Sequence, residues 1–499
     1  MQNRMIKSVW FLITVIGLAS CTTKSTSNMN VFETSANGNL HAAKKDFKKS
    51  DQHSNVSIDT KKRKQTIIGF GGAFTEASAH NINLLSPENR SAIIAAYFGE
   101  EGAAYSLTRT HMNSCDFSVS NYSYTPVEGD TALEHFTIES DRSDILPMIK
   151  DAQEVSKEGF KIFGSPWSAA PWMKDNNSYV GGKLKKEYYD TWALFFSKYV
   201  DAYRAEGIDI WGFTVENEPH GNGNNWESMH YSPEEMTDFV VNHLGPQLEA
   251  EGMGDLVIMG YDQNRQGAPE WADVMYRDDT TKRYYDGMAV HWYESTYDYF
   301  PATLDYVRNA APDKILLQTE ACVDNQVPVW GDDAWYWQKE ATDWGYYWRE
   351  EENRHLHPKY APVNRYARDI IGCLNHWVQG WVDWNMVLDT QGGPNWAKNW
   401  CIAPIIVDPE KDEVYYTPLY YVMKHFSKHI RPGAQVLEVD RTDSDLMVTA
   451  AENENGSIVV VVFNEGEQPR SFDLNIDGTE RLIAIDAQAL QTIVIEPKE

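Results

Sequence analysis

The stretch W-G-F-T-V-E-N-E-P at residues 211–219 joins an apolar run to a pair of carboxylates. The run 208–215 is rich in β-branched and aromatic residues, which predicts a short buried strand. Glu216 and Glu218 follow where this strand should end, and Pro219 prevents the hydrogen-bond ladder from continuing. In a parallel barrel the carboxyl ends of the strands form the active-site face. The position of Glu218 therefore makes it a candidate general acid.

Short apolar runs of this kind recur along the chain and alternate with amphipathic stretches such as 186–206. The runs are 67–70, 105–109, 161–164, 208–215, 256–260, 287–291, 315–319 and 377–382. Eight strands with helical crossovers predict an α/β fold, a (β/α)8 TIM barrel, which we assign to residues 67–430. The alternative is a doubly wound open sheet, which usually has a glycine-rich phosphate loop after its first strand. G-F-G-G at 69–72 does not match that fingerprint, so we expect a tight turn there.

The C-terminal residues 431–499 have a different pattern, in which apolar and polar residues alternate with a period of two. This pattern predicts strands at 435–439, 446–450, 457–463, 471–476, 481–485 and 490–495. Asn-Gly at 455–456 and Asp-Gly at 477–478 are typical of the tight turns between such strands. We expect an accessory antiparallel β-sandwich that supports the barrel, with carbohydrate binding as the alternative role.

The N-terminus has the layout of an export signal. Arg4 and Lys7 precede an apolar run over 9–18, which is too short to span a membrane. It ends in Leu-Ala-Ser-Cys at 18–21, which resembles the lipobox of bacterial lipoproteins and implies a signal peptide at 1–20 and a lipid on Cys21. Ordinary secretion is the alternative. We expect a protein of the bacterial cell envelope, attached to the outer membrane or held in the periplasm by its lipid anchor.

The next segment, 21–54, is rich in Ser, Thr, Asn and Lys and lacks apolar periodicity, which predicts a flexible tether. Alternation then predicts one strand at 55–66. The four other cysteines, at 115, 322, 373 and 401, have no CxxC spacing, and we interpret them as mostly buried thiols while leaving a disulfide open.

The composition limits the possible partners. A net charge of −29 argues against nucleic acid or an anionic membrane surface as a partner. Aromatic residues make up 13% of the chain, and such rings can stack on sugars or line a cleft. No His and carboxylate cluster has the spacing of metal ligands, so we expect neither a metal nor a cofactor.

Residue types that handle sugars follow six of the eight predicted strands. They are Asn113 and Asp116, Trp167 and Trp172, Asn217 and Glu218, Trp292 and Tyr293, Glu320, and finally Trp381, Trp384 and Asn385. Carboxylates and amides can hold hydroxyl groups, and the rings can stack on a sugar face. Glu218 and Glu320, after the fourth and seventh strands, would face each other across the barrel mouth. Such a pair suits glycoside hydrolysis by double displacement.

Six ordered motifs make the sequence recognisable. They are S-C-D-F-S at 114–118, S-P-W-S-A-A-P-W-M-K at 165–174, T-V-E-N-E-P at 214–219, A-V-H-W-Y at 289–293, T-E-A-C-V at 319–323, and G-W-V-D-W-N with G-G-P-N-W within 380–396. From residue 67 to its end, the chain resembles glycoside hydrolase family 30, the glucosylceramidase family. This resemblance implies a retaining β-glycosidase whose sandwich also takes in the strand at 55–66.

The resemblance also implies roles for individual residues. Glu218 matches the acid/base and Glu320 the nucleophile, while Tyr293 matches a residue that hydrogen-bonds the nucleophile. Arg109 matches a supporting arginine, and Glu216 has no catalytic role in the motif. The positions that contact the terminal sugar are Asp116, Trp167, Asn217, Trp381 and Asn395.

The expected substrate is a β-linked glucoside or a β-glucan. A glucosylceramidase-like β-glucosidase is our first hypothesis, and an endo-β-1,6-glucanase shares the same motifs. Related branches of the family act on xylosides or fucosides. A hypothesis of another class is a surface lipoprotein that captures glycans without cleaving them, but the presence of both glutamates favours an enzyme.

Overall fold

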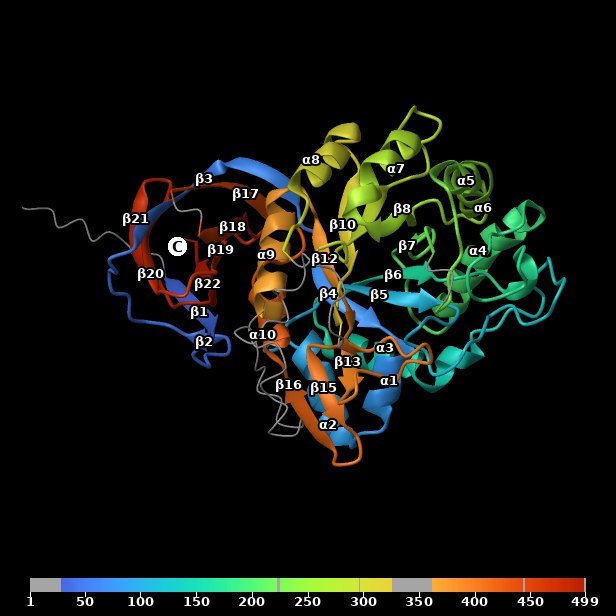
Figure 1. The fold of residues 1–499 in the computed structure, drawn as a ribbon, viewed down its shortest axis with the longest axis horizontal. Helices are drawn as coiled ribbons and strands as arrows, with labels where there is room; N and C mark the ends of the chain where they lie inside the picture. The colour runs from blue at the N-terminus through green and yellow to red at the C-terminus, as the bar shows by residue number, and fades with distance from the viewer. Residues whose placement is uncertain (1–27, 222–224, 296, 325–360, 443–444, 498–499) are drawn as a thin grey trace, which may run out of the picture.

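The protein forms a barrel beside a curled sheet, with helices between the two (Figure 1). The computed structural model describes residues 28–221, 225–295, 297–324, 361–442 and 445–497. The expected signal peptide at 1–20 and the lipidation site Cys21 lie outside the described residues. None of the helices in these ranges is long and apolar enough to cross a membrane.

Eight parallel strands close into the barrel in the order β10-β12-β4-β5-β6-β7-β8-β9. They are β4 (Gly69–Phe74), β5 (Leu107–Met112), β6 (Lys161–Pro166), β7 (Gly212–Thr214), β8 (Val257–Asn264), β9 (Gly287–His291), β10 (Ile315–Glu320) and β12 (Gly380–Asn385). Each predicted run overlaps one of these strands, so the (β/α)8 prediction is confirmed. The boundaries differ by a few residues, most clearly at β7, where 208–215 was expected.

The tight turn expected at 69–72 is wrong, because these residues belong to strand β4. A Cβ atom on Gly71 would lie 2.0 Å from the carbonyl oxygen of Leu107 on the neighbouring strand β5. Gly71 therefore permits the close approach of two strands. Glycine serves this purpose as well as forming turns, and the local sequence does not distinguish the two.

In the described part of the chain, ten α-helices accompany the strands. They are α1 (Glu76–Asn83), α2 (Pro87–Phe98), α3 (Ile145–Val155), α4 (Tyr189–Ala205), α5 (Pro233–Phe239), α6 (Gly245–Ala250), α7 (Ala268–Met275), α8 (Pro301–Ala310), α9 (Ala361–Asn375) and α10 (Pro418–Ser427). Helix α4 confirms the helix expected over 186–206. Its buried aromatic face packs toward the barrel, and Gly207 follows it with a φ of +81°.

Apolar side chains fill the barrel interior. Leu107, Phe163, Met259, Ala289, Leu317 and Val382 form one buried cluster there. Short strands extend the carboxyl ends of the barrel strands: β11 (Val323–Asp324) pairs with β14 (Cys401–Ile402), and β13 (Val387–Asp389), β15 (Ile405–Asp408) and β16 (Glu413–Tyr416) form a small sheet. These extensions build loops directly over the barrel mouth.

The accessory domain is one nine-stranded sheet in the order β2-β1-β22-β19-β18-β17-β3-β20-β21, curled upon itself (Figure 1). Its strands are β1 (Met29–Ser35), β2 (Ala42–Ala43), β3 (His53–Thr66), β17 (Gln435–Arg441), β18 (Leu446–Glu452), β19 (Ile458–Asn464), β20 (Arg470–Ile476), β21 (Thr479–Ile485) and β22 (Ala489–Ile495). All six strands predicted in the C-terminal region are present. Side chains from strands across the whole sheet meet in one apolar core, as expected of a sandwich, and β3 confirms the N-terminal contribution.

The flexible tether expected over 21–54 is wrong for residues 29–35, because they form strand β1, which pairs along its full length with β22. Three polar residues of this strand, Glu33, Thr34 and Ser35, are buried. Glu33 accepts hydrogen bonds from Lys44 at 2.8 Å and from Gln491 at 2.9 Å. A polar strand of this kind is stable only because distant residues satisfy its side chains, which composition does not reveal.

Three histidines meet where strand β1 packs against helix α10. The Nε2 atoms of His41 and His429 lie 3.0 Å apart, and His425 Nε2 lies 2.8 Å from Thr34 Oγ1. Phe32 stacks on the rings of His41 and His429. Burial, together with the charges of nearby lysines, lowers the pKa of His41 and the pKa of His429 to about 3 each. The pKa of His425 is lowered well below its usual value by burial and by the other two histidines.

These depressed pKa values predict an acid-sensitive junction. The unfolded chain binds protons on these histidines below about pH 6.5 while the folded chain does not. The contribution of these histidines to the free energy of unfolding is therefore fully present above that pH and is lost as the pH falls toward 3. We expect the melting temperature of the parent to fall more steeply between pH 7 and pH 4.5 than that of a His41→Gln/His429→Gln variant. Replacing exposed His135 by Gln is the control, and equal slopes for the parent and the double variant would contradict the prediction.

Candidate active site

Two glutamates stand at the ends of barrel strands β7 and β10, which β8 and β9 separate. Glu320 is the last residue of β10, and Glu218 follows β7. Glu218 has a left-handed backbone with a φ of +48°, which is costly for a residue other than glycine. Its N–H donates to the carbonyl of Asp262 at 3.0 Å, and its carbonyl accepts from Gly221 N–H at 2.7 Å. These bonds hold the strained turn, which aims the carboxyl group into the mouth.

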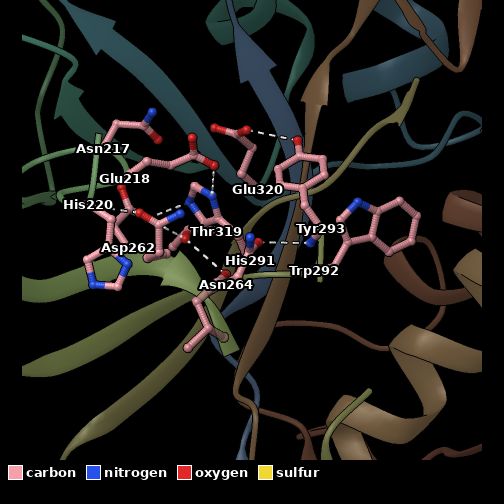
Figure 2. A network of polar contacts seen from close by, with 12 residues as sticks. Asn217, Glu218, His220, Asp262, Asn264, His291, Trp292, Tyr293, Thr319 and Glu320 are labelled. Atoms are coloured by element: carbon pink, nitrogen blue, oxygen red, sulfur yellow. Dashed lines mark hydrogen bonds and ion pairs between the residues drawn. The ribbon is translucent and has the colours of Figure 1, made fainter. Parts of the chain in front are cut away.

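The carboxyl groups of Glu218 and Glu320 lie side by side (Figure 2). A carboxylate oxygen of one lies within 4.8 Å of a carboxylate oxygen of the other. Retaining glycosidases have carboxyl groups about 5 to 5.5 Å apart, and inverting enzymes need roughly 6.5 Å or more to fit a water. The structure therefore brings the two predicted catalytic residues together, and the upper limit of 4.8 Å is compatible with the closer, retaining arrangement. The Glu218 side chain is 20% exposed and that of Glu320 8%, so Glu218 is the more accessible to solvent.

A fully buried arginine holds the nucleophile candidate. Arg109, on β5, donates through Nη1 to Glu320 Oε2. Its Nη2 donates to Asn217 Oδ1 at 2.8 Å and to Asp262 Oδ2 at 2.7 Å, and its Nε donates to Ser165 Oγ at 2.9 Å. The supporting position predicted for Arg109 is thus where the structure has it. A guanidinium is planar and always charged, so it fixes Glu320 and Asn217 relative to each other.

Tyr293 reaches the other oxygen of Glu320. Its hydroxyl donates to Glu320 Oε1 at 2.8 Å, which matches the contact implied for this residue (Figure 2). Burial raises the pKa of Glu320, while the positive charges of His291 and Arg109 and the Tyr293 hydrogen bond oppose that rise. The contacts with Arg109, His291 and Tyr293 each favour the ionised form of Glu320. A carboxylate needs this form to act as a nucleophile.

Asp262 and His291 complete the network behind the glutamates. His291 Nε2 lies 3.0 Å from Asp262 Oδ1, and its Nδ1 lies 3.2 Å from Glu218 Oε1. Burial would lower the pKa of His291, but the charges of Glu320 and Asp262 and its hydrogen bonds raise that pKa to about 9. Burial would raise the pKa of Asp262, but Arg109 and His291 hold that pKa at about 2. At neutral pH His291 is therefore protonated and forms an ion pair with Asp262, while its Nδ1 donates to Glu218.

Glu218, His291 and Glu320 also form the kind of group that can hold a metal ion, since one ligand atom of each lies within 4.8 Å of the others. The sequence spacing did not reveal this group because its members follow three different strands. A metal needs the neutral imidazole, and the raised pKa of His291 keeps it protonated at neutral pH. His291 donates to Glu218 in this group, so a metal ion would have to displace that proton in order to bind.

The loops above the barrel place Asp116 and Asn395 together. Asn399 donates from Nδ2 to Asp116 Oδ2 at 3.2 Å. The side chain of Asn395 donates from Nδ2 to the carbonyl of Asn399 at 3.0 Å and accepts at Oδ1 from the N–H of Asn399 at 3.2 Å. Burial and the charge of Glu320 raise the pKa of Asp116 well above its usual value. Asn395 thus reaches Asp116 through Asn399, and its predicted contact with a sugar stays a prediction.

The tryptophan assignment needs a correction. Trp384 stacks on Trp167 with ring centroids 5.0 Å apart, and the guanidinium of Arg109 lies over both rings. Trp381, which we expected to contact the sugar, lies outside the barrel. It is fully buried, and its Nε1 donates to Asp369 Oδ1 of helix α9 at 2.8 Å.

Side-chain alternation along strand β12 explains this difference. Val382 belongs to the cluster inside the barrel, so Trp384, two residues later, lies on the same side, while Trp381 faces the helices. The ring of this strand that lies beside Trp167 and Arg109 is therefore Trp384. The sequence motif contains both tryptophans and does not say which one faces inward.

Two residues of the network have no predicted role. Asp262 follows the fifth predicted run by two residues, and His291 lies within the quoted motif A-V-H-W-Y. Inspecting every strand end for an acid would have found Asp262. Glu216, which the motif leaves outside catalysis, is fully buried, and no residue in the described part of the chain hydrogen-bonds its carboxyl oxygens. Burial raises the pKa of Glu216 well above its usual value, which favours the neutral carboxyl group, while the charge of Lys174 opposes the rise.

Two family models match the chain. The model described as the glycosyl hydrolase family 30 TIM-barrel domain matches residues 67–430, and the family 30 beta sandwich domain matches residues 433–493. The first match has the same bounds as the barrel predicted from the sequence. Together the two models cover most of the described chain, and both predicted domains are represented.

Known proteins are similar to this chain over most of its length. The chain is 37% identical to putative glucosylceramidase 3 of Caenorhabditis elegans over 76% of this chain and 69% of that protein. It is 34% identical to the lysosomal acid glucosylceramidase of Mus musculus over 83% of this chain and 78% of that protein. An endo-1,6-β-D-glucanase of Neurospora crassa is 29% identical over 81% and 79% of the two chains. The crystal structure of SrfJ from Salmonella typhimurium superposes with a TM-score of 0.82 at 28% identity, covering 94% of this chain and 100% of that one.

The contacts of Glu320 predict the effect of removing its charge. Glu320→Gln keeps the shape of the side chain but cannot attack as an anion, so we expect turnover of an aryl β-glucoside to fall by at least about 10³-fold. Circular dichroism should show an unchanged fold. The isosteric control is Asp262→Asn, which alters the same network without removing the attacking group. Its turnover should fall less than that of Glu320→Gln. A folded Glu320→Gln enzyme with turnover near that of the parent would refute the assignment.

Proposed function

We propose, since the chain belongs to glycoside hydrolase family 30, that this retaining glycosidase is a β-glucosidase of the glucosylceramidase type. The observation that carries the proposal is similarity at 34–37% identity to glucosylceramidases. The endo-1,6-β-D-glucanase aligns at 29%. The arrangement of Glu218, Glu320 and Arg109 supports the same reaction type for either substrate.

In the proposed mechanism Glu320 is the nucleophile. Its carboxylate attacks the anomeric carbon, and the bond from that carbon to the leaving oxygen breaks as Glu218 gives the oxygen a proton. The product is a glycosyl ester on Glu320. Arg109 and Tyr293 hold the two oxygens of Glu320, so the attacking lone pair is already oriented before the substrate binds.

The second step reverses these roles. Glu218, now a carboxylate, takes a proton from water, and the resulting hydroxide displaces Glu320 from the anomeric carbon with overall retention. His291 donates to Glu218 and so stabilises the carboxylate that forms in the first step. Trp167 and Trp384 offer a stacked aromatic floor for the sugar, and Asp116 and Asn217 are placed to bind its hydroxyl groups.

An endo-β-1,6-glucanase is the second candidate because the same domain pair occurs in a solved endo-β1,6-glucanase, which superposes with a TM-score of 0.80 at 25% identity. The two candidates differ in where the chain of the substrate is cut. An exo-acting glucosidase releases single glucose units, and an endo-acting glucanase releases oligosaccharides.

Product analysis by mass spectrometry distinguishes the two. We expect glucose from glucosylceramide and from gentiobiose, and no series of oligosaccharides from a β-1,6-glucan. The Glu320→Gln variant is the control for contaminating activities. A ladder of gluco-oligosaccharides from the glucan, with glucosylceramide left intact, would overturn the first candidate in favour of the second.

The acid/base role of Glu218 predicts a dependence on the leaving group. A dinitrophenyl group departs without a proton, so Glu218→Ala should cleave a dinitrophenyl β-glucoside far faster than a natural β-glucoside. Azide should restore turnover by attacking the glycosyl-enzyme, giving a β-glucosyl azide that proton NMR identifies. The matched variant Glu320→Ala should instead give the α-azide, because only one displacement occurs. Equal losses on both substrates without azide rescue would assign the proton to another group.

A further inference from the structure

Two cysteines from distant parts of the chain meet beside the nucleophile. The Sγ atoms of Cys322 and Cys401 lie 2.9 Å apart, although 79 residues separate them in the sequence. Cys322 follows Glu320 by two residues. Cys401 is the first residue of β14. Both side chains are buried, with exposures of 4% and 1%.

The backbone keeps this meeting in place. Strand β11 pairs antiparallel with β14 in a register that sets Asp324 opposite Cys401 and Val323 opposite Ile402. The carbonyl of Cys322 accepts a hydrogen bond from Trp292 Nε1 at 3.2 Å. A disulfide requires two Cβ atoms brought to about 4 Å by the surrounding backbone, with little strain on closing the bond of about 2.05 Å. The sulfur atoms of Cys322 and Cys401, 2.9 Å apart beside this strand pair, need to move by only about 1 Å to reach bonding distance.

We propose that Cys322 and Cys401 form a disulfide that ties the segment after Glu320 to the loop that carries Asn395 and Asn399. The oxidant is another disulfide, such as oxidised glutathione. The thiolate of one cysteine attacks it, forming a mixed disulfide and releasing one thiol. The second cysteine then displaces the other thiol, so that two cysteines are oxidised, the external disulfide is reduced, and the two protons end on the released thiols.

The cross-link joins two parts of the site that act on the same sugar. Cys322 lies next to the nucleophile, and the Tyr293 hydroxyl, which donates to Glu320, lies 3.6 Å from Cys322 Sγ. Cys401 follows the loop in which Asn399 binds Asp116. With the bond closed, covalent structure restrains the position of Glu320 relative to Asn399, which in turn holds Asp116 by a hydrogen bond. Cys322 and Cys401 are thus positioning residues, and this step rests on the proposed role of Glu320.

Peptide mapping tests the bond directly and needs no activity. The folded parent is incubated with oxidised glutathione, unfolded in N-ethylmaleimide, digested without reductant and analysed by mass spectrometry. We expect a peptide pair linked through Cys322 and Cys401. Cys115 and Cys373, whose sulfur atoms contact Ser118 and Asp369, should be alkylated as internal controls. Quantitative alkylation of Cys322 and Cys401 would overturn the proposal.

Stability and kinetics test what the bond does. Tris(carboxyethyl)phosphine should lower the melting temperature of the parent by at least about 2 °C. It should have the same effect on Cys373→Ala and none on Cys401→Ala. At 25 °C, kcat/KM of folded Cys401→Ala should fall by about tenfold, a loss that Cys373→Ala should not share.

The two sets of results separate the possible failures. A linked peptide with unchanged kcat/KM in Cys401→Ala would keep the disulfide and overturn its positioning role. If Glu320→Gln retained turnover while the linked peptide was present, the proposed nucleophile would be wrong and the disulfide would stand. If Cys401→Ala does not fold, Cys401→Ser and mapping of the parent provide the same tests.

Discussion

The buried guanidinium of Arg109 is the constraint on which the rest of the site depends. A charge removed from water costs several kcal/mol unless it is paired, and Arg109 is fully buried. Glu320, Asp262, Asn217 and Ser165 satisfy its donors from four different strand ends. The closed barrel is what brings those ends together. Because one planar group bonds to all of them, the geometry of the mouth is set by a single side chain.

Positive and negative groups alternate along the contacts that start at Arg109. Asp262 is held ionised, with a pKa of about 2, between Arg109 and His291, and His291 in turn is held protonated, with a pKa of about 9. Two cations thereby face the two glutamates of the mouth. Positive groups fixed near a carboxylate stabilise it without the reorganisation that water would need. The network thus prepares Glu320 for attack and supports negative charge on Glu218 after proton transfer.

The accessory sheet joins both ends of the described chain to the barrel. Strand β1 adds to β22, and the long strand β3 lies between β17 and β20 before the chain enters β4. Helices α9 and α10 lie between the barrel and the curled sheet (Figure 1). His41, His425 and His429 form part of the contact between strand β1 and helix α10. The sheet therefore supports the side of the barrel formed by β12 and β4, where Trp384 originates, rather than standing as a separate module.

The sequence by itself determined the eight barrel strands, the six C-terminal strands and the placement of Glu218 and Glu320 at strand ends, because periodicity and strand termini are local properties. Tertiary structure alone decided the rest. The sequence did not predict strand β1 because its polar side chains have hydrogen-bond partners far along the chain. Trp384 rather than Trp381 faces the mouth because the orientation of a side chain depends on the register of its strand. Asp262, His291 and the Cys322–Cys401 contact arise where separate strands converge, and a convergence in space leaves no spacing in the sequence from which it could be predicted.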